Sequence, residues 1–133
     1  MKFYSFIVII LFFSFQSLKA QKQPDQLPVF PGCEQVKEKM PCFKEKVLEH
    51  ISANFNTDLL HQVKDTKQVN MFVQFEISPE GKLQNFEITS PYDALNQEMK
   101  KVLQSLPKVQ PAQSGGNAIS MQYQLPIVFE IKQ

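Results

Sequence analysis

The sequence predicts an α+β fold in which a three-stranded antiparallel sheet is covered on one face by two helices. Apolar residues recur every three or four positions in residues 41–54 and 95–106, which is typical of amphipathic helices. They alternate with polar residues in 69–78, 83–90 and 119–131, which is typical of half-buried strands. The order is therefore helix, strand, strand, helix, strand. The simplest way to bury all five apolar surfaces is to pack both helices on one face of the sheet.

The N-terminus has the pattern of a secretory signal peptide. Lys2 is followed by an apolar stretch from Phe3 to Phe15 and a polar region that ends at Ala20. A membrane-spanning helix needs about 20 apolar residues, and this run is shorter, so we expect cleavage between Ala20 and Gln21. The chain would contact a membrane only if this segment stayed uncleaved.

We therefore expect three segments and export to the periplasm. Residues 1–20 form the signal peptide, 21–40 an extended lead-in that contains both cysteines, and 41–133 one domain. The prolines in "QKQPDQLPVFP" favour an extended lead-in.

The charge pattern does not favour nucleic acid as a partner. The chain has 14 basic and 13 acidic residues and a net charge of +1. All of the basic residues are lysines, whereas nucleic-acid recognition favours a basic face and arginine forks. We expect neither nucleic-acid binding nor a polybasic membrane patch.

The two cysteines, Cys33 and Cys42, lie close together in "VFPGCEQVKEKMPCF" and leave three interpretations open. A zinc site needs four ligands, and His50 and His61 are not at a zinc-finger spacing from the cysteines. A redox centre typically has two residues between its cysteines, whereas eight intervene here. We favour a disulfide, because an exported chain meets an oxidising compartment. We expect no metal and no cofactor.

The first helix should begin near Pro41, since proline suits the first turn, and run to about Asn54. Its buried stripe would comprise residues four positions apart: Phe43, Val47, Ile51 and Phe55. Residues 56–67 are ambiguous between a turn and a loose helical segment. The disulfide would join the lead-in to the first turn of this helix.

The next two strands form a hairpin around "SPEG", in which Gly81 can adopt positive φ. In the return strand, the apolar alternation changes phase between Leu83 and Phe86, so we expect a β-bulge near Gln84 or Asn85.

The second helix should be capped by Asp93 or Ser90 and ended by Pro107. A loop over 109–118 would lead to the last strand. Pro126 cannot donate to a β-ladder, which indicates an edge strand or a bulge at that point.

No catalytic constellation is recognisable in the sequence. No serine lies in a G-x-S-x-G turn, and "SGGN" lacks the context of a phosphate-binding loop. His50 is predicted to pack on its helix and His61 to be solvated. We expect that the protein is not an enzyme.

The free edge of the last strand is the candidate binding site. An edge strand can pair through its main chain with a visiting strand, although every open sheet has edges whether or not they have a function. The candidate residues are Ile119, Ser120, Met121, Gln122, Tyr123, Gln124 and Leu125.

An ordered set of segments resembles the C-terminal domain of TonB, in a short exported form. The segments are "VFPGCE" followed nine residues later by "CF", then "EHISANF", "VNMFVQFEISPEGKLQNFEITSP", "ALNQEMKKVLQSLPK" and "YQLPIVFEI". Together they span residues 27–132. The chain departs from the family at "NFNTD", where Tyr-Pro is usual, and at Lys67, where glycine is usual. Val109 replaces a common tryptophan and Ala112 a common glycine.

The resemblance implies a periplasmic protein-interaction module whose last strand pairs with a "TonB box" peptide of an outer-membrane receptor. A complete energy transducer also needs an inner-membrane helix and a long proline-rich spacer. We therefore expect this chain to resemble the end of a transducer rather than the whole. The alternative is a structural envelope domain that associates with itself as a homodimer and has no receptor partner.

Overall fold

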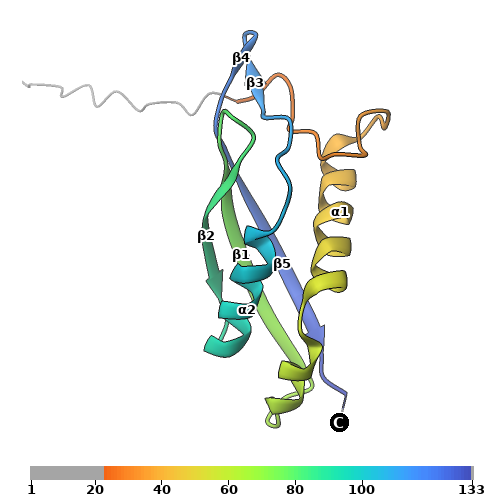
Figure 1. The fold of residues 1–133 in the computed structure, drawn as a ribbon, viewed down its shortest axis with the longest axis vertical. Coiled ribbons are helices and arrows are strands. Elements are labelled where there is room, and N and C mark those ends of the chain that lie inside the picture. The colour runs from red at the N-terminus through yellow and green to blue at the C-terminus, as the bar shows by residue number, and fades with distance from the viewer. Residues whose placement is uncertain (1–22, 133) are drawn as a thin grey trace, which may run out of the picture.

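A computed structural model describes residues 23–132 (Figure 1). The signal peptide and its cleavage point at Ala20 and Gln21 lie outside these residues. The helical elements are α1 (Lys39–Asn54), the 3-10 helix η1 (Thr57–Gln62) and α2 (Asp93–Gln104). The strands are β1 (Gln68–Ile77), β2 (Leu83–Thr89), β3 (Gln113–Ser114), β4 (Asn117–Ala118) and β5 (Met121–Glu130).

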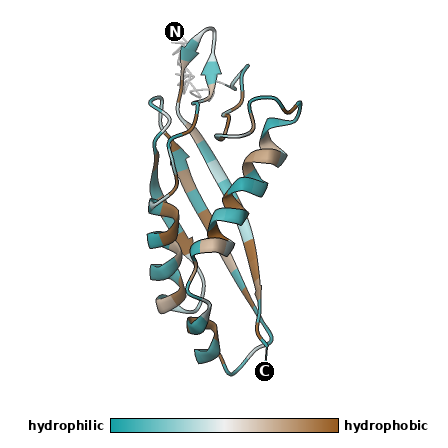
Figure 2. Cartoon of the chain, turned by 45° about the vertical axis from the view of Figure 1, so that its right-hand side comes forward, coloured by the Kyte–Doolittle hydropathy of each residue, from teal (hydrophilic) through white to brown (hydrophobic). Residues whose placement is uncertain are grey.

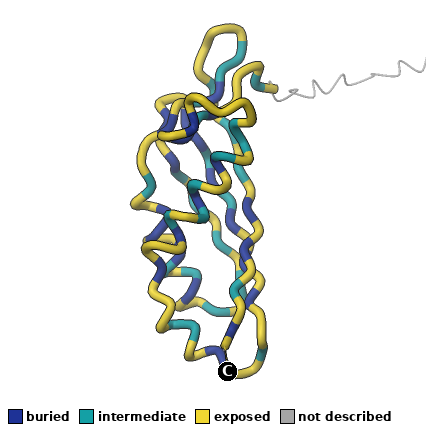
Figure 3. The backbone as a smooth tube through the Cα atoms, turned by 90° about the vertical axis from the view of Figure 1, so that its right-hand side faces the viewer, coloured by how far each residue is buried: buried dark blue, intermediate teal, exposed yellow. Residues whose placement is uncertain are grey.

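The main sheet has the order β2-β1-β5, with both pairs antiparallel. Along β1 every second residue is buried, as the alternating sequence requires. Figures 2 and 3 show the helices in one layer and the sheet in the other, with α1 crossing the strands obliquely. The predicted fold class, with both helices on one face, is confirmed.

Helix α1 begins at Lys39, two residues before the predicted start at Pro41, and ends at Asn54 as predicted. Phe43, Val47 and Ile51 form its buried stripe. The ambiguous segment after it forms η1, and Val63 at its end is buried against the core.

The predicted bulge lies in β2. The register with β1 shifts between Gln74 and Glu76, and Asn85 takes a positive φ of 55°. The Asn85 side chain donates a hydrogen bond to the Glu76 carboxylate at 2.8 Å, which holds the extra residue against its neighbouring strand.

The predicted cap of α2 is wrong. The N-cap position is Tyr92, without a side-chain cap, and Asp93 is the first helical residue. The Ser90 hydroxyl instead accepts from the Tyr92 N–H at 3.2 Å, two residues before the N-cap position. The helix ends at Gln104, ahead of Pro107.

The predicted loop over 109–118 contains a small β-hairpin, formed by β3 and β4 around Gly115 and Gly116. The lead-in runs antiparallel to residues 110–113, which precede and begin this hairpin. Gln26 exchanges backbone hydrogen bonds with Gln113, and Val29 exchanges them with Gln110. The last strand begins at Met121 rather than Ile119, whose N–H donates to the Ala112 carbonyl at 2.9 Å.

Candidate functional site

The candidate site is the outer edge of β5, which among residues 23–132 pairs with β1 on one side only. In an antiparallel pair, residues alternate between positions that exchange two hydrogen bonds and positions whose backbone groups point away from the partner. Pro126 lies opposite Phe72 and has no N–H to exchange. At the end of the strand, the Ile131 N–H donates to the Lys67 carbonyl at 2.8 Å. The odd-numbered residues of β5 therefore bond to β1.

It follows that the even-numbered residues direct their backbone groups to the free edge. Gln122 and Gln124 each present an N–H and a carbonyl there, as do Val128 and Glu130. Pro126 presents a carbonyl alone. Of the two predicted alternatives at Pro126, an edge strand or a bulge, the structure shows the edge strand.

The candidate residues differ in exposure according to the same alternation. Ser120, Gln122 and Gln124 are exposed, whereas Leu125 is buried. Ile119, Met121 and Tyr123 are intermediate. The structure thus brings the polar residues to the surface at the edge, while the apolar ones attach the strand to the core.

An open groove of about 780 Å³ runs beside the start of β5. The lead-in forms one side of it and the strand the other, and the lining residues are Gln23, Pro24, Leu27, Ile119, Ser120, Met121 and Gln122. Leu27 is 42% exposed and contributes an apolar surface to the lead-in side of the groove. The sequence prediction missed the lead-in side of this groove, because the lead-in pairs with residues more than 80 positions away.

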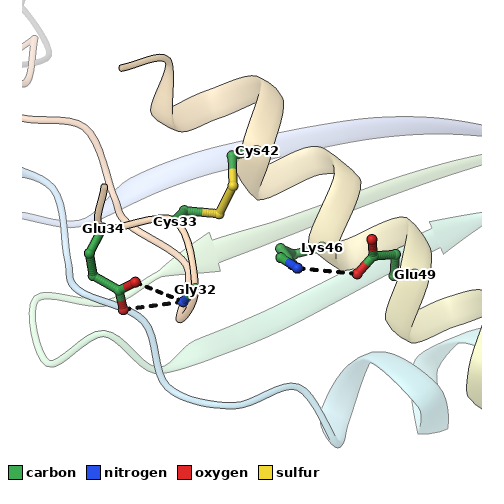
Figure 4. Close-up of polar contacts among 6 residues, drawn as sticks. All are labelled: Gly32, Cys33, Glu34, Cys42, Lys46 and Glu49. Atoms are coloured by element: carbon green, nitrogen blue, oxygen red, sulfur yellow. Dashed lines mark hydrogen bonds and ion pairs between the residues drawn. A yellow bond between two sulfur atoms is a disulfide. The ribbon is translucent and has the colours of Figure 1, made fainter. Parts of the chain in front are cut away.

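The disulfide between Cys33 and Cys42 holds the lead-in to the first turn of α1 (Figure 4). Of the three interpretations of the cysteines, the predicted disulfide is confirmed. The ten-residue loop that it closes begins beside Gly32, whose N–H donates to the Glu34 carboxylate at 2.9 Å. Backbone hydrogen bonds, first from Glu34 itself and then from Gly32, lower the pKa of the Glu34 carboxyl.

Aromatic side chains support the strand beneath the groove. The ring of Tyr123 lies 5.1 Å from that of Phe43 on α1 and 5.2 Å from that of Phe75 on β1. Partial burial raises the pKa of the Tyr123 hydroxyl. Because Tyr123 is fixed by both layers, the outward groups of its neighbours Gln122 and Gln124 have a defined direction.

His50 and Ser105 approach each other, but they do not form a nucleophile and its base. The His50 Nε2 lies 2.8 Å from the Ser105 Oγ and 3.0 Å from the Val102 carbonyl. The Ser105 hydroxyl donates instead to the Val102 carbonyl at 2.6 Å, so its proton is directed at the backbone. The contact connects α1 to the end of α2. His61 is exposed on η1, as predicted.

Within residues 23–132, no group of three or more His, Cys, Asp or Glu side chains is placed to hold a metal ion. In the same range, no helix has both the length and the apolar character needed to cross a membrane.

Comparison with known proteins identifies one family. The family described as "Gram-negative bacterial TonB protein C-terminal" matches residues 63–131, from the end of η1 through β5. Helix α1 and the disulfide segment lie before the matched region. No curated protein matches the chain. The match includes every strand and α2, and the chain therefore belongs to the family of C-terminal domains of Gram-negative bacterial TonB proteins.

Proposed function

We propose that the protein is a periplasmic interaction module that binds an extended, TonB box-like peptide of an outer-membrane receptor by strand addition along β5. Such binding would link it to TonB-dependent transport across the outer membrane. The observation that carries the proposal is the free edge of β5, where Gln122 and Gln124 direct backbone groups outward and Gln122 lines the groove. Family membership supports a protein as the partner.

The β5 edge suits strand addition better than the β2 edge does. Strand β2 has seven residues and is interrupted at Asn85 by a bulge, and bulges impair pairing at sheet edges. Strand β5 has ten residues in unbroken register with β1. A visiting strand would meet a regular row of groups only along β5.

Self-association through β5 is the competing function. A symmetric pair of antiparallel β5 strands would place Pro126, near the middle of Met121–Glu130, close to the two-fold axis. Each copy would then lack a donor at the centre of the new ladder. A short visiting peptide can avoid Pro126, and we therefore favour peptide binding over the homodimer.

Export belongs to the same proposal. The signal-peptide pattern of residues 1–20 and the disulfide between Cys33 and Cys42 both suit an oxidising compartment outside the cytoplasm. N-terminal sequencing of the secreted protein tests the expected cleavage, because the mature chain should begin at Gln21.

The proposed function is tested by an NMR titration of the oxidised, exported protein with synthetic TonB box peptides from outer-membrane receptors of the same organism. Amide shifts concentrated in residues 119–125 are the expected result. Saturating millimolar peptide without any shift would contradict receptor binding. A mass that doubles with protein concentration would instead support the self-associating alternative.

A further inference from the structure

We propose that Pro126 divides the free edge of β5 and confines a visiting strand to the half that ends at Leu125, so that the site takes an extended segment of about five residues. This inference rests on the proposed strand addition at β5, and it assigns to that site a length and a chemistry. Because Pro126 has no backbone N–H to donate, it would determine how long a segment can pair with the edge.

The backbone alternation along β5 carries the argument. Since odd residues bond to β1, substituting an odd residue by proline would break the native sheet, whereas Pro126 is even and leaves the sheet intact. Its missing N–H therefore affects the free edge alone. A visiting carbonyl opposite Pro126 would find no donor, and this favours a ladder that stops at Gln124.

Each half of the edge has two residues with an outward N–H and carbonyl, Gln122 and Gln124 before Pro126 and Val128 and Glu130 after it. The halves differ in their surroundings, because Gln122 in the first half lines the groove that Pro24 and Leu27 border. The half of β5 before Pro126 runs from residue 121 to residue 125. A visiting strand rises by about the same 3.3 Å per residue as β5, so about five visitor residues span this half.

The open face of the sheet indicates which side chains the visitor should carry. Visitor residues directly opposite Gln122 and Gln124 would place their side chains on this face, beside those amides. The direct cross-strand neighbours of these two visitor residues are the amides of Gln122 and Gln124, so polar side chains that hydrogen-bond to an amide suit both positions.

Three single substitutions test the inference in the full, exported and oxidised protein. Gln124→Pro and Val128→Pro each remove one outward N–H, on opposite sides of Pro126, and neither removes a bond to β1. They form a matched pair. Pro126→Ala restores the missing donor. The probes are receptor TonB box peptides trimmed or extended to five, seven and nine residues, and the readout is the dissociation constant from calorimetry together with amide shifts.

We expect Gln124→Pro to weaken binding about tenfold, because one ladder bond is lost and a visiting carbonyl stays unpaired. Val128→Pro should change binding less than about twofold. The wild-type affinity should level off at five residues, whereas Pro126→Ala should gain about fivefold with the longer peptides. Amide spectra of the free variants confirm that each one folds.

Two results would overturn the inference while leaving the proposed function standing. One is equal weakening by both proline substitutions. The other is a wild-type affinity that keeps rising with peptide length and is unchanged by Pro126→Ala. If no peptide of any length shifts residues 119–125, the proposed function itself fails, and the inference fails with it.

Discussion

At the scale of single residues, Gly81 is the position with the least tolerance for a side chain. It adopts φ +80°, and a Cβ there would lie 1.8 Å from the Val109 carbonyl oxygen. The Val109 N–H also donates to the Gly81 carbonyl at 2.9 Å. This contact joins the β1–β2 turn to the segment that pairs with the lead-in. Val109 itself is buried.

Gly81→Ala should therefore lower the free energy of unfolding by about 3 kcal/mol or more, because the left-handed conformation and the lost hydrogen bond both contribute. Gly115→Ala is the matched control. It also has positive φ, +58°, but meets nothing within 4 Å, so it should cost only about 1 kcal/mol. Urea unfolding of both variants measures the difference. Equal losses would show that the Val109 contact is unimportant.

At the scale of elements, the disulfide and the lead-in form one unit with α1. Cys33 is fully buried, and Phe30 beside it packs edge-on against Phe43 with ring centroids 5.4 Å apart. The lead-in continues from there to its backbone pairing with residues 110–113. The lead-in side of the candidate groove is therefore attached twice, to residues 110–113 through the backbone and to α1 through Cys33.

Replacing both cysteines by alanine should lower stability by about 2.7 kcal/mol, the chain-entropy value for a ten-residue loop. Peptide affinity at β5 should fall as well, because the Leu27 side of the groove would keep only its backbone pairing with residues 110–113. Lys46→Ala is the control: it removes the exposed Lys46–Glu49 ion pair on the same helix and should cost less than about 0.5 kcal/mol. Thermal unfolding and the peptide titration check both expectations. Unchanged affinity in the double alanine variant would mean that the attachment of the lead-in to α1 does not contribute to peptide binding.

At the scale of the whole molecule, the sheet has two edges, and the structure leaves β5 as the regular one. Its backbone alternation predicts a pattern of hydrogen exchange. In the free protein, the amides of Tyr123, Leu125 and Ile127 should exchange slowly, because they bond to β1, and those of Gln122 and Gln124 should exchange quickly.

Bound peptide should then slow exchange at Gln122 and Gln124 while leaving Val128 unchanged. Hydrogen exchange followed by NMR, at low and at high protein concentration, provides the test. Slow exchange of Gln122 and Gln124 in the free protein would mean that the edge is already covered. If that protection grew with concentration, the covering chain would be a second copy, in contradiction to peptide binding by a monomer.

The elements could be predicted from the sequence because their signals are local. Helix α1 has one apolar face, which its stripe of Phe43, Val47 and Ile51 predicts. Strand β1 also has one apolar face, which its strict alternation predicts. The bulge at Asn85 could be located because it shifts the same alternation by one residue. The cap of α2 was mispredicted because Ser90 and Asp93 both suit a cap by residue type, and backbone geometry placed the helix start between them at Tyr92.

By itself, the sequence determined the order of elements and the layer they pack in, since both follow from apolar periodicity. The missing donor of Pro126 left an edge strand and a bulge open, and the strand order with its unbroken register decided for the edge. Only the tertiary structure decided that the lead-in pairs with residues 110–113 and borders the start of β5. Only the register with β1 decided which backbone groups of β5 face outward. Both depend on contacts between residues far apart in the chain, which no local pattern encodes.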